Sequence, residues 1–133
     1  MSADLRLAKQ LLASGTHTIV AVKAGDTVAA ASGPGLAPLL AVFDRLHGAA
    51  VADRAVGRAA ALLLLHAGAA CVHGLVLSEP GRAALEQHGC PASWDRLVPH
   101  IRNRMGTGLC PMEERALGMG APAEAYRAFV LRE

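Results

Sequence analysis

Aromatic side chains are scarce in this sequence of 133 residues, which contains one Trp, one Tyr and two Phe. Proteins that bind single strands by base stacking need several aromatic side chains, and the sequence offers no such series. The 13 Lys and Arg residues against 11 Asp and Glu residues give a formal charge of 13 − 11 = +2, without a basic run. We therefore do not expect nucleic acid as a partner.

Long apolar runs and paired cysteines are also missing. The longest apolar run, AAALLLLHAGAA at 59–70, is too short to span a bilayer. The first 15 residues have an amphipathic helical pattern with charged residues and lack the apolar centre of a signal peptide. The three cysteines, Cys71, Cys90 and Cys110, form no CxxC pair, which is typical of free thiols in a reducing compartment. We expect a cytoplasmic protein with no membrane association.

The sequence does contain an alternation of strand and helix patterns over one expected domain, residues 1–133. A helix ends at Gly15, and two strands follow at 16–32 around a turn at Lys23–Asp26. Further strands are expected at 49–54, 70–78 and 92–101, and helices within 33–48, at 55–68, at 78–89 and after Pro111. This order predicts an α/β fold of three α-β-α layers, with a mixed sheet of about five strands.

The most distinctive stretch is NRMGTGLCPMEE at 103–114. Its first part offers flexible glycines, an amide, a hydroxyl and a guanidinium, from Asn103, Arg104, Gly106, Thr107 and Gly108. Such a loop could bind an anionic or nucleotide-like ligand, in which case Arg104→Ala should abolish binding at little cost in stability. The alternative is a tight structural loop in which Arg104 pairs with Glu113 or Glu114.

The second part of this stretch, CPMEE, has the pattern of a helix start. Cys110 takes the cap position, Pro111 the first helical position, and Glu113 could reach back to the cap N–H. A thiol at a helix N-terminus can become a nucleophile, which makes Cys110 a candidate catalytic residue and Glu113 a candidate base. The alternative is a buried, inert Cys110.

A second candidate region lies where the strand at 49–54 is expected to pass into a helix. Free N–H groups at the helix start, with Arg54 and Arg58 one turn apart, would bind a phosphate or carboxylate group. Asp53 could act there as a general base. The alternative is that Asp53 only caps the helix and that both arginines are solvated.

Three segments, VADRAVGRAAALLL at 51–64, VLSEPGRAALEQHG at 76–89 and NRMGTGLCPMEE, resemble those of an uncharacterised prokaryotic domain-of-unknown-function family. The resemblance implies a cytidine-deaminase-like fold. In that fold zinc is held at two helix starts, by His/Cys-x-Glu and by Pro-Cys-x-x-Cys. The corresponding segments here, GPGLAP at 33–38 and DRAVGR at 53–58, contain neither His nor Cys. We therefore expect no zinc, no other cofactor and no zinc-dependent deaminase activity.

The sequence thus predicts a protein of unknown function that binds a small anionic or nucleotide-related molecule without zinc. The pair Asp53 and Arg54 and the loop at 103–110 are expected at one cleft. The alternatives are a zinc-independent enzyme that uses Cys110 or a carboxylate, and a structural or interaction subunit. The Ala- and Leu-rich helices favour a homodimer.

Overall fold

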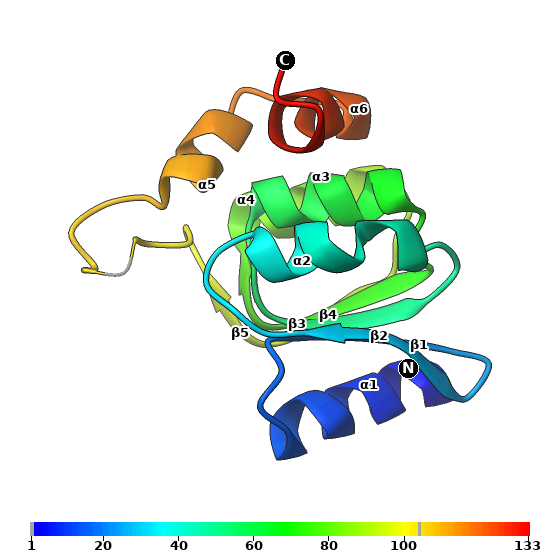
Figure 1. The fold of residues 1–133 in the computed structure, drawn as a ribbon. Helices are drawn as coiled ribbons and strands as arrows, with labels where there is room; N and C mark the ends of the chain where they lie inside the picture. Colours follow the sequence, from blue (N-terminus) through cyan, green and yellow to red (C-terminus); the bar gives the residue numbers. More distant parts are fainter. Residues whose placement is uncertain (1, 104) are drawn as a thin grey trace.

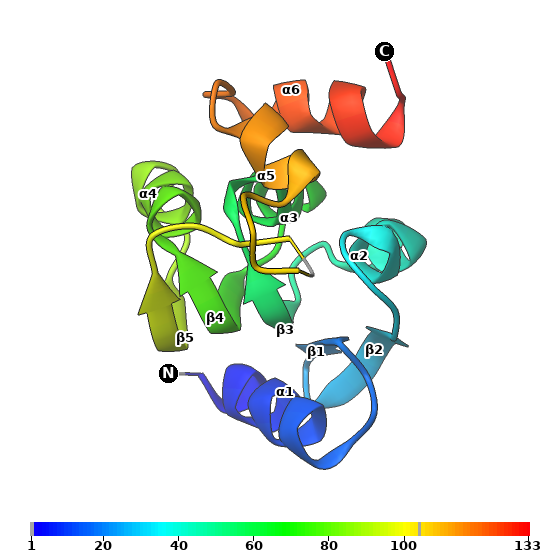
Figure 2. The same ribbon diagram turned by 90° about the vertical axis from the view of Figure 1, so that its left-hand side faces the viewer.

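The computed structural model describes residues 2–103 and 105–133, and shows a five-stranded mixed sheet with helices on both faces (Figures 1 and 2). The strand order is β2-β1-β3-β4-β5. The strands are β1 (Ile19–Lys23), β2 (Asp26–Ala31), β3 (Ala50–Val56), β4 (Cys71–Ser78) and β5 (Ala92–Val98). Strand β1 is antiparallel to both of its neighbours, whereas β3, β4 and β5 run parallel. Parallel neighbours need crossover connections, which the helices between these strands supply.

The helices lie in unequal layers. They are α1 (Ala3–Ser14), α2 (Ala37–Val42) with a 3-10 turn at Phe43–Arg45, α3 (Arg58–Ala67), α4 (Glu79–Gln87), α5 (Pro111–Ala116) and α6 (Pro122–Ala125), which continues as a π-helical turn at Tyr126–Val130. Figure 1 shows α1 alone on one face, α2, α3 and α4 on the other, and α5 and α6 stacked beyond α3. No helix in the described part of the chain is long and apolar enough to cross a membrane.

Helix α3 is the centre of the larger core. Six consecutive residues, from Ala59 to Leu64, are buried, so this helix has no solvent-exposed stripe over that length. A helix that is apolar on all sides must be covered on all sides. Here the sheet lies beneath α3, α4 lies beside it, and α5 and α6 pack over it. The small Ala side chains at 59–61 allow this close approach.

Several local predictions are confirmed. The turn between β1 and β2 has positive φ at Ala24 (52°) and Gly25 (82°), as a tight hairpin requires. The Asp4 carboxylate of α1 accepts hydrogen bonds from both of their N–H groups at 3.0 Å. Ser78 caps α4 by accepting from Gly81 N at 3.0 Å. Helix α3 ends at Gly68, whose φ is 84°.

The predicted boundary between the strand at 49–54 and the next helix is wrong. Strand β3 continues to Val56, because Ala55 and Val56 pair with Val76 and Leu77 of β4. Helix α3 begins only at Arg58, and Gly57 is its cap residue. Asp53 therefore lies inside a strand and does not cap the helix.

Candidate functional site

A large cleft with a volume of about 1260 Å³ lies at the C-terminal end of β3. Its walls come from the loop before α2, the end of β3, residues 101–103, 105 and 110–113, and the C-terminal residues. Asp53 and Arg54 share this cleft with Asn103 and Cys110, as the sequence predicted. They meet because the chain after β5 crosses back over the end of β3 towards α5, which Figure 2 shows.

The cleft is rich in positive charge. Among the described residues, four arginines line it: Arg54, Arg102, Arg115 and Arg132. The acidic lining residues are Asp53, Glu113 and Glu133. The guanidinium of Arg115 lies over the Phe129 ring, 5.0 Å from its centroid, which fixes one wall. Since Glu113 is buried at 2% exposure, the solvent-facing part of the cleft favours an anionic ligand.

Asp53 is the acidic residue of the cleft whose pKa is shifted by its surroundings. Burial raises the pKa of its carboxyl from 3.8 to about 7, and hydrogen bonds from the backbone N–H groups of Arg54 and Ala55 oppose this only in part. Its side chain keeps some contact with the cleft, so it can exchange protons with solvent. A carboxyl that titrates near neutral pH suits a general acid or base.

We expect Asp53→Asn to raise the free energy of unfolding by about 1–3 kcal/mol above neutral pH. Between pH 3.8, the ordinary pKa, and about pH 7, folded Asp53 keeps a proton that the unfolded chain has lost. Stability therefore falls as the pH rises through this window and is constant above it. The asparagine variant should lack that decline. Urea unfolding at about pH 5 and about pH 8 measures the difference, and equal pH dependence of both proteins would contradict it.

The start of α3 is not a free anion site, which corrects the prediction for this helix. Both carboxylate oxygens of Glu113 accept a hydrogen bond from the backbone N–H of Arg58, at 2.9 and 2.7 Å. Glu113 was expected to cap its own helix α5, but it reaches across 55 residues to cap α3. Gly57 is essential to this contact, because a Cβ there would occupy the space of the Glu113 carboxylate. Any ligand of this helix start would have to displace a buried side chain.

Arg58 also differs from its predicted role in ligand binding. Its Nε donates to Met119 O at 2.9 Å and its Nη1 donates to Pro80 O at 3.1 Å. It is half-buried and is not among the residues that line the cleft. Arg58 therefore ties the start of α4 to the loop between α5 and α6.

The loop at 103–108 is closed by its own hydrogen bonds. The Asn103 Oδ1 accepts from Thr107 N at 3.1 Å, and its Nδ2 donates to Thr107 Oγ1 at 3.2 Å. Gly106 has φ of 69°, as the sequence predicted for a glycine of this loop. Gly106 and Thr107 do not line the cleft, and Gly108 lines a second, smaller cavity instead. Arg104 lies outside the described residues.

Cys110 stands at the cap position of α5, as predicted, and lines the cleft. Its side chain is partly exposed and makes no capping hydrogen bond. The role of Cys110 as a nucleophile remains a prediction. Among the described residues, no group of three or more His, Cys, Asp or Glu side chains is arranged to hold a metal ion.

A hydrogen-bonded chain of polar side chains on β4 and β5 was not predicted from the sequence. The Nδ1 of His73 lies 2.7 Å from Ser93 Oγ, and its Nε2 lies 3.1 Å from Asp95 Oδ1. In the tautomer that donates to Asp95, the ring accepts from the Ser93 hydroxyl, as a serine-activating histidine does. However, His73 is 1% exposed and none of the three residues lines either cavity. This arrangement stabilises the parallel pair of strands.

We expect acid sensitivity from His73. Burial, followed by the nearby charge of Lys9, lowers the pKa of His73 below 6.5, although Asp95 opposes the shift. As the pH falls below 6.5, the unfolded chain binds a proton that folded His73 resists, so stability falls until the lowered pKa is passed. His73→Gln should lose stability less steeply with acid than His100→Gln, an exposed control, in urea unfolding across this range. Equal slopes for both variants would contradict the expectation.

The comparisons with known proteins agree with this fold. The crystal structure of a DUF1893 family protein (TM1506) from Thermotoga maritima is similar to this one with a TM-score of 0.90. The similarity covers 100% of this chain and 92% of that chain at 28% sequence identity. No curated protein gives a significant match. A family described as a domain of unknown function (DUF1893) matches residues 7–131, and the chain therefore belongs to this family.

Proposed function

We propose that this protein binds a small anionic or nucleotide-related molecule in the large cleft without zinc. The observation that carries the proposal is the lining of the cleft, which among the described residues holds four arginines and two acids other than the buried Glu113. Arg54 is exposed in this cleft and has no ion-pair partner among the described residues. A ligand anion would supply that partner.

We also propose a cytidine-deaminase-like fold, which the strand order β2-β1-β3-β4-β5 supports. The cleft receives the starts of two helices, at Leu36 and Ala37 of α2 and at Gly57 of α3. These are the places where deaminases hold zinc, yet here they present apolar side chains and a glycine. The start of α3 is instead occupied by the Glu113 carboxylate. These features support an organic ligand in place of a metal centre.

A zinc-independent enzyme is the second candidate, and the Asp53 carboxyl with its pKa of about 7 favours it. Turnover of an anionic substrate by the wild type, lost in Asp53→Asn with binding retained, would support the enzyme. Retention of a ligand by native mass spectrometry, unchanged after incubation, would support a binding protein alone.

We expect Arg54→Ala to weaken binding of inorganic pyrophosphate or AMP by at least about tenfold, as loss of a charged contact of about 1.4 kcal/mol would do. Stability should change by no more than about 0.5 kcal/mol, because the side chain is exposed. Arg45→Ala is the matched control, since Arg45 is exposed and does not line the cleft. Isothermal titration measures both variants. Equal affinities, or no binding by the wild type, would refute this assignment of the cleft.

A further inference from the structure

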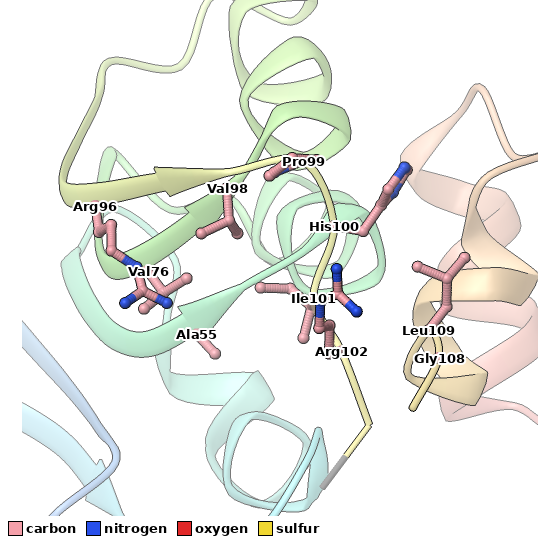
Figure 3. Close-up of a pocket in the computed structure, with 10 residues that line it drawn as sticks. All are labelled: Ala55, Val76, Arg96, Val98, Pro99, His100, Ile101, Arg102, Gly108 and Leu109. Atoms are coloured by element: carbon pink, nitrogen blue, oxygen red, sulfur yellow. The ribbon is translucent and has the colours of Figure 1, made fainter. Parts of the chain in front are cut away.

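A second, smaller cavity of about 430 Å³ lies beside the large cleft (Figure 3). Ala55, Val76 and Arg96 line it from β3, β4 and β5, where they pair in register across the three parallel strands. The last residue of β5 and the chain after it complete the lining with residues 98–102 and 108–109. Cavities at the C-terminal ends of parallel strands are where ligands of open α/β sheets usually bind.

Most of the lining of this cavity is apolar. Val76, Val98, Ile101 and Leu109 contribute side chains without polar atoms, and Pro99 extends this surface. Ala55 is too small to fill the space at the end of β3. The volume of the cavity lies in the range of small-molecule sites, about 300–1,000 Å³.

The polar groups of the cavity are basic. Arg96, His100 and Arg102 line it, and none of its described lining residues is acidic. Figure 3 shows Arg96 on one side of the cavity and Arg102 on the other, with Ala55 and Val76 between them. Arg96 makes no ion pair with any described residue, and Arg102 has only a long hydrogen bond of 3.5 Å to Gly106 O. These guanidinium groups are available to an anion.

We infer that this cavity binds a small organic carboxylate with an apolar body. The carboxylate would accept hydrogen bonds from Arg96 and Arg102, for which the planar guanidinium is suited, and the apolar body would lie against Val76, Val98 and Leu109. An inorganic anion would leave the apolar walls unused. A neutral apolar molecule would leave the guanidinium groups of Arg96 and Arg102 without a charged partner from the ligand.

This inference does not depend on the ligand proposed for the large cleft. Ala55, Ile101 and Arg102 line both cavities, so the two are neighbours. Arg96 lines only the small cavity, and Arg54 lines only the large cleft. Variants of these two arginines therefore distinguish occupation of one cavity from occupation of the other.

The isoleucines of the chain provide the readout, because the sequence contains only Ile19 and Ile101. Ile101 lines the small cavity, whereas Ile19 is buried in the core at 1% exposure. In protein labelled at the isoleucine δ1 methyl groups, cyclohexanecarboxylate should shift the Ile101 signal saturably and leave the Ile19 signal in place. The neutral cyclohexanecarboxamide and inorganic phosphate should each bind at least about tenfold more weakly.

Two variants test the site itself. Arg96→Ala should weaken binding of cyclohexanecarboxylate at least about tenfold, and Arg54→Ala should leave it unchanged. Val76→Phe should fill the cavity and abolish the shift of Ile101, while an unchanged Ile19 signal reports an intact core.

The opposite results overturn the inference. They are the absence of an Ile101 shift, equal affinity for acid and amide, or unchanged binding in Arg96→Ala. Loss of binding in Arg54→Ala with retention in Arg96→Ala would place the carboxylate in the large cleft, which also overturns it. Failure of pyrophosphate and AMP to bind would leave this inference standing, since those probes address the other cavity.

Discussion

Replacement of Glu113 by Ala is expected to lower the free energy of unfolding by about 3–4 kcal/mol, through loss of charged capping hydrogen bonds and of a buried side chain. Both carboxylate oxygens of Glu113 bind the first N–H of α3, at Arg58. A negative charge at this end also favours the helix dipole. Without it, the start of a helix that is buried along six residues loses its cap. Urea unfolding measures the change.

The neighbouring residue provides the control for this prediction. Glu114 is exposed and lies on the same short helix, so Glu114→Ala should change stability by no more than about 0.5 kcal/mol. Glu113→Gln keeps the shape and one acceptor oxygen, and should fall between the two at about 1–2 kcal/mol. Equal stabilities of the two alanine variants would show that α5 does not hold the start of α3.

Gly57→Ala is expected to destabilise the protein by about 2–3 kcal/mol through overpacking. The φ of Gly57 is −95° and its ψ is −169°, which any residue adopts. The backbone alone would therefore predict that Ala stabilises by about 0.4–1 kcal/mol. The surroundings reverse the sign of the expected stability change, because a Cβ at Gly57 would occupy the space of the Glu113 carboxylate and lie 2.9 Å from Ile101 Cγ1.

Two further variants separate this contact from a general effect of losing a glycine. Gly118→Ala is the control, since a Cβ at Gly118 meets no atom within 4 Å, and it should change stability by no more than about 0.5 kcal/mol. Gly57→Ala combined with Glu113→Ala should cost less than the sum of the single variants, because both disrupt one junction. Additive costs, or a Gly57→Ala protein as stable as the wild type, would refute the contact.

The junction at Glu113 and Gly57 also lies in the wall of the cleft. It fixes α5 against the start of α3, so that Cys110 and Met112 form a wall facing Arg54 and Ala55 of β3. A looser α5 would change the distance between these walls. For Glu113→Ala, Gly57→Ala and Arg54→Ala, both the stability and the ligand affinity should therefore be measured.

The sequence by itself determined the features that short-range chemistry controls. The hairpin turn at Ala24 and Gly25, the Ser78 cap and the end of α3 at Gly68 each depend on residues a few positions apart. The α/β class, the five strands of the mixed sheet and the helices on both faces were predicted because apolar periodicity and breakers are also local signals.

The tertiary structure decided the partners of the polar side chains. Glu113 could cap either its own helix or another, and only the packing of α5 over α3 brings it to Arg58, 55 residues away. Asp53 was misplaced because pairing with β4 extends β3, which the local sequence does not show. The contact of His73 with Ser93 and Asp95 depends on the register of two parallel strands. Such contacts join residues distant in sequence, and burial fixes them only once the sheet and its helices are assembled.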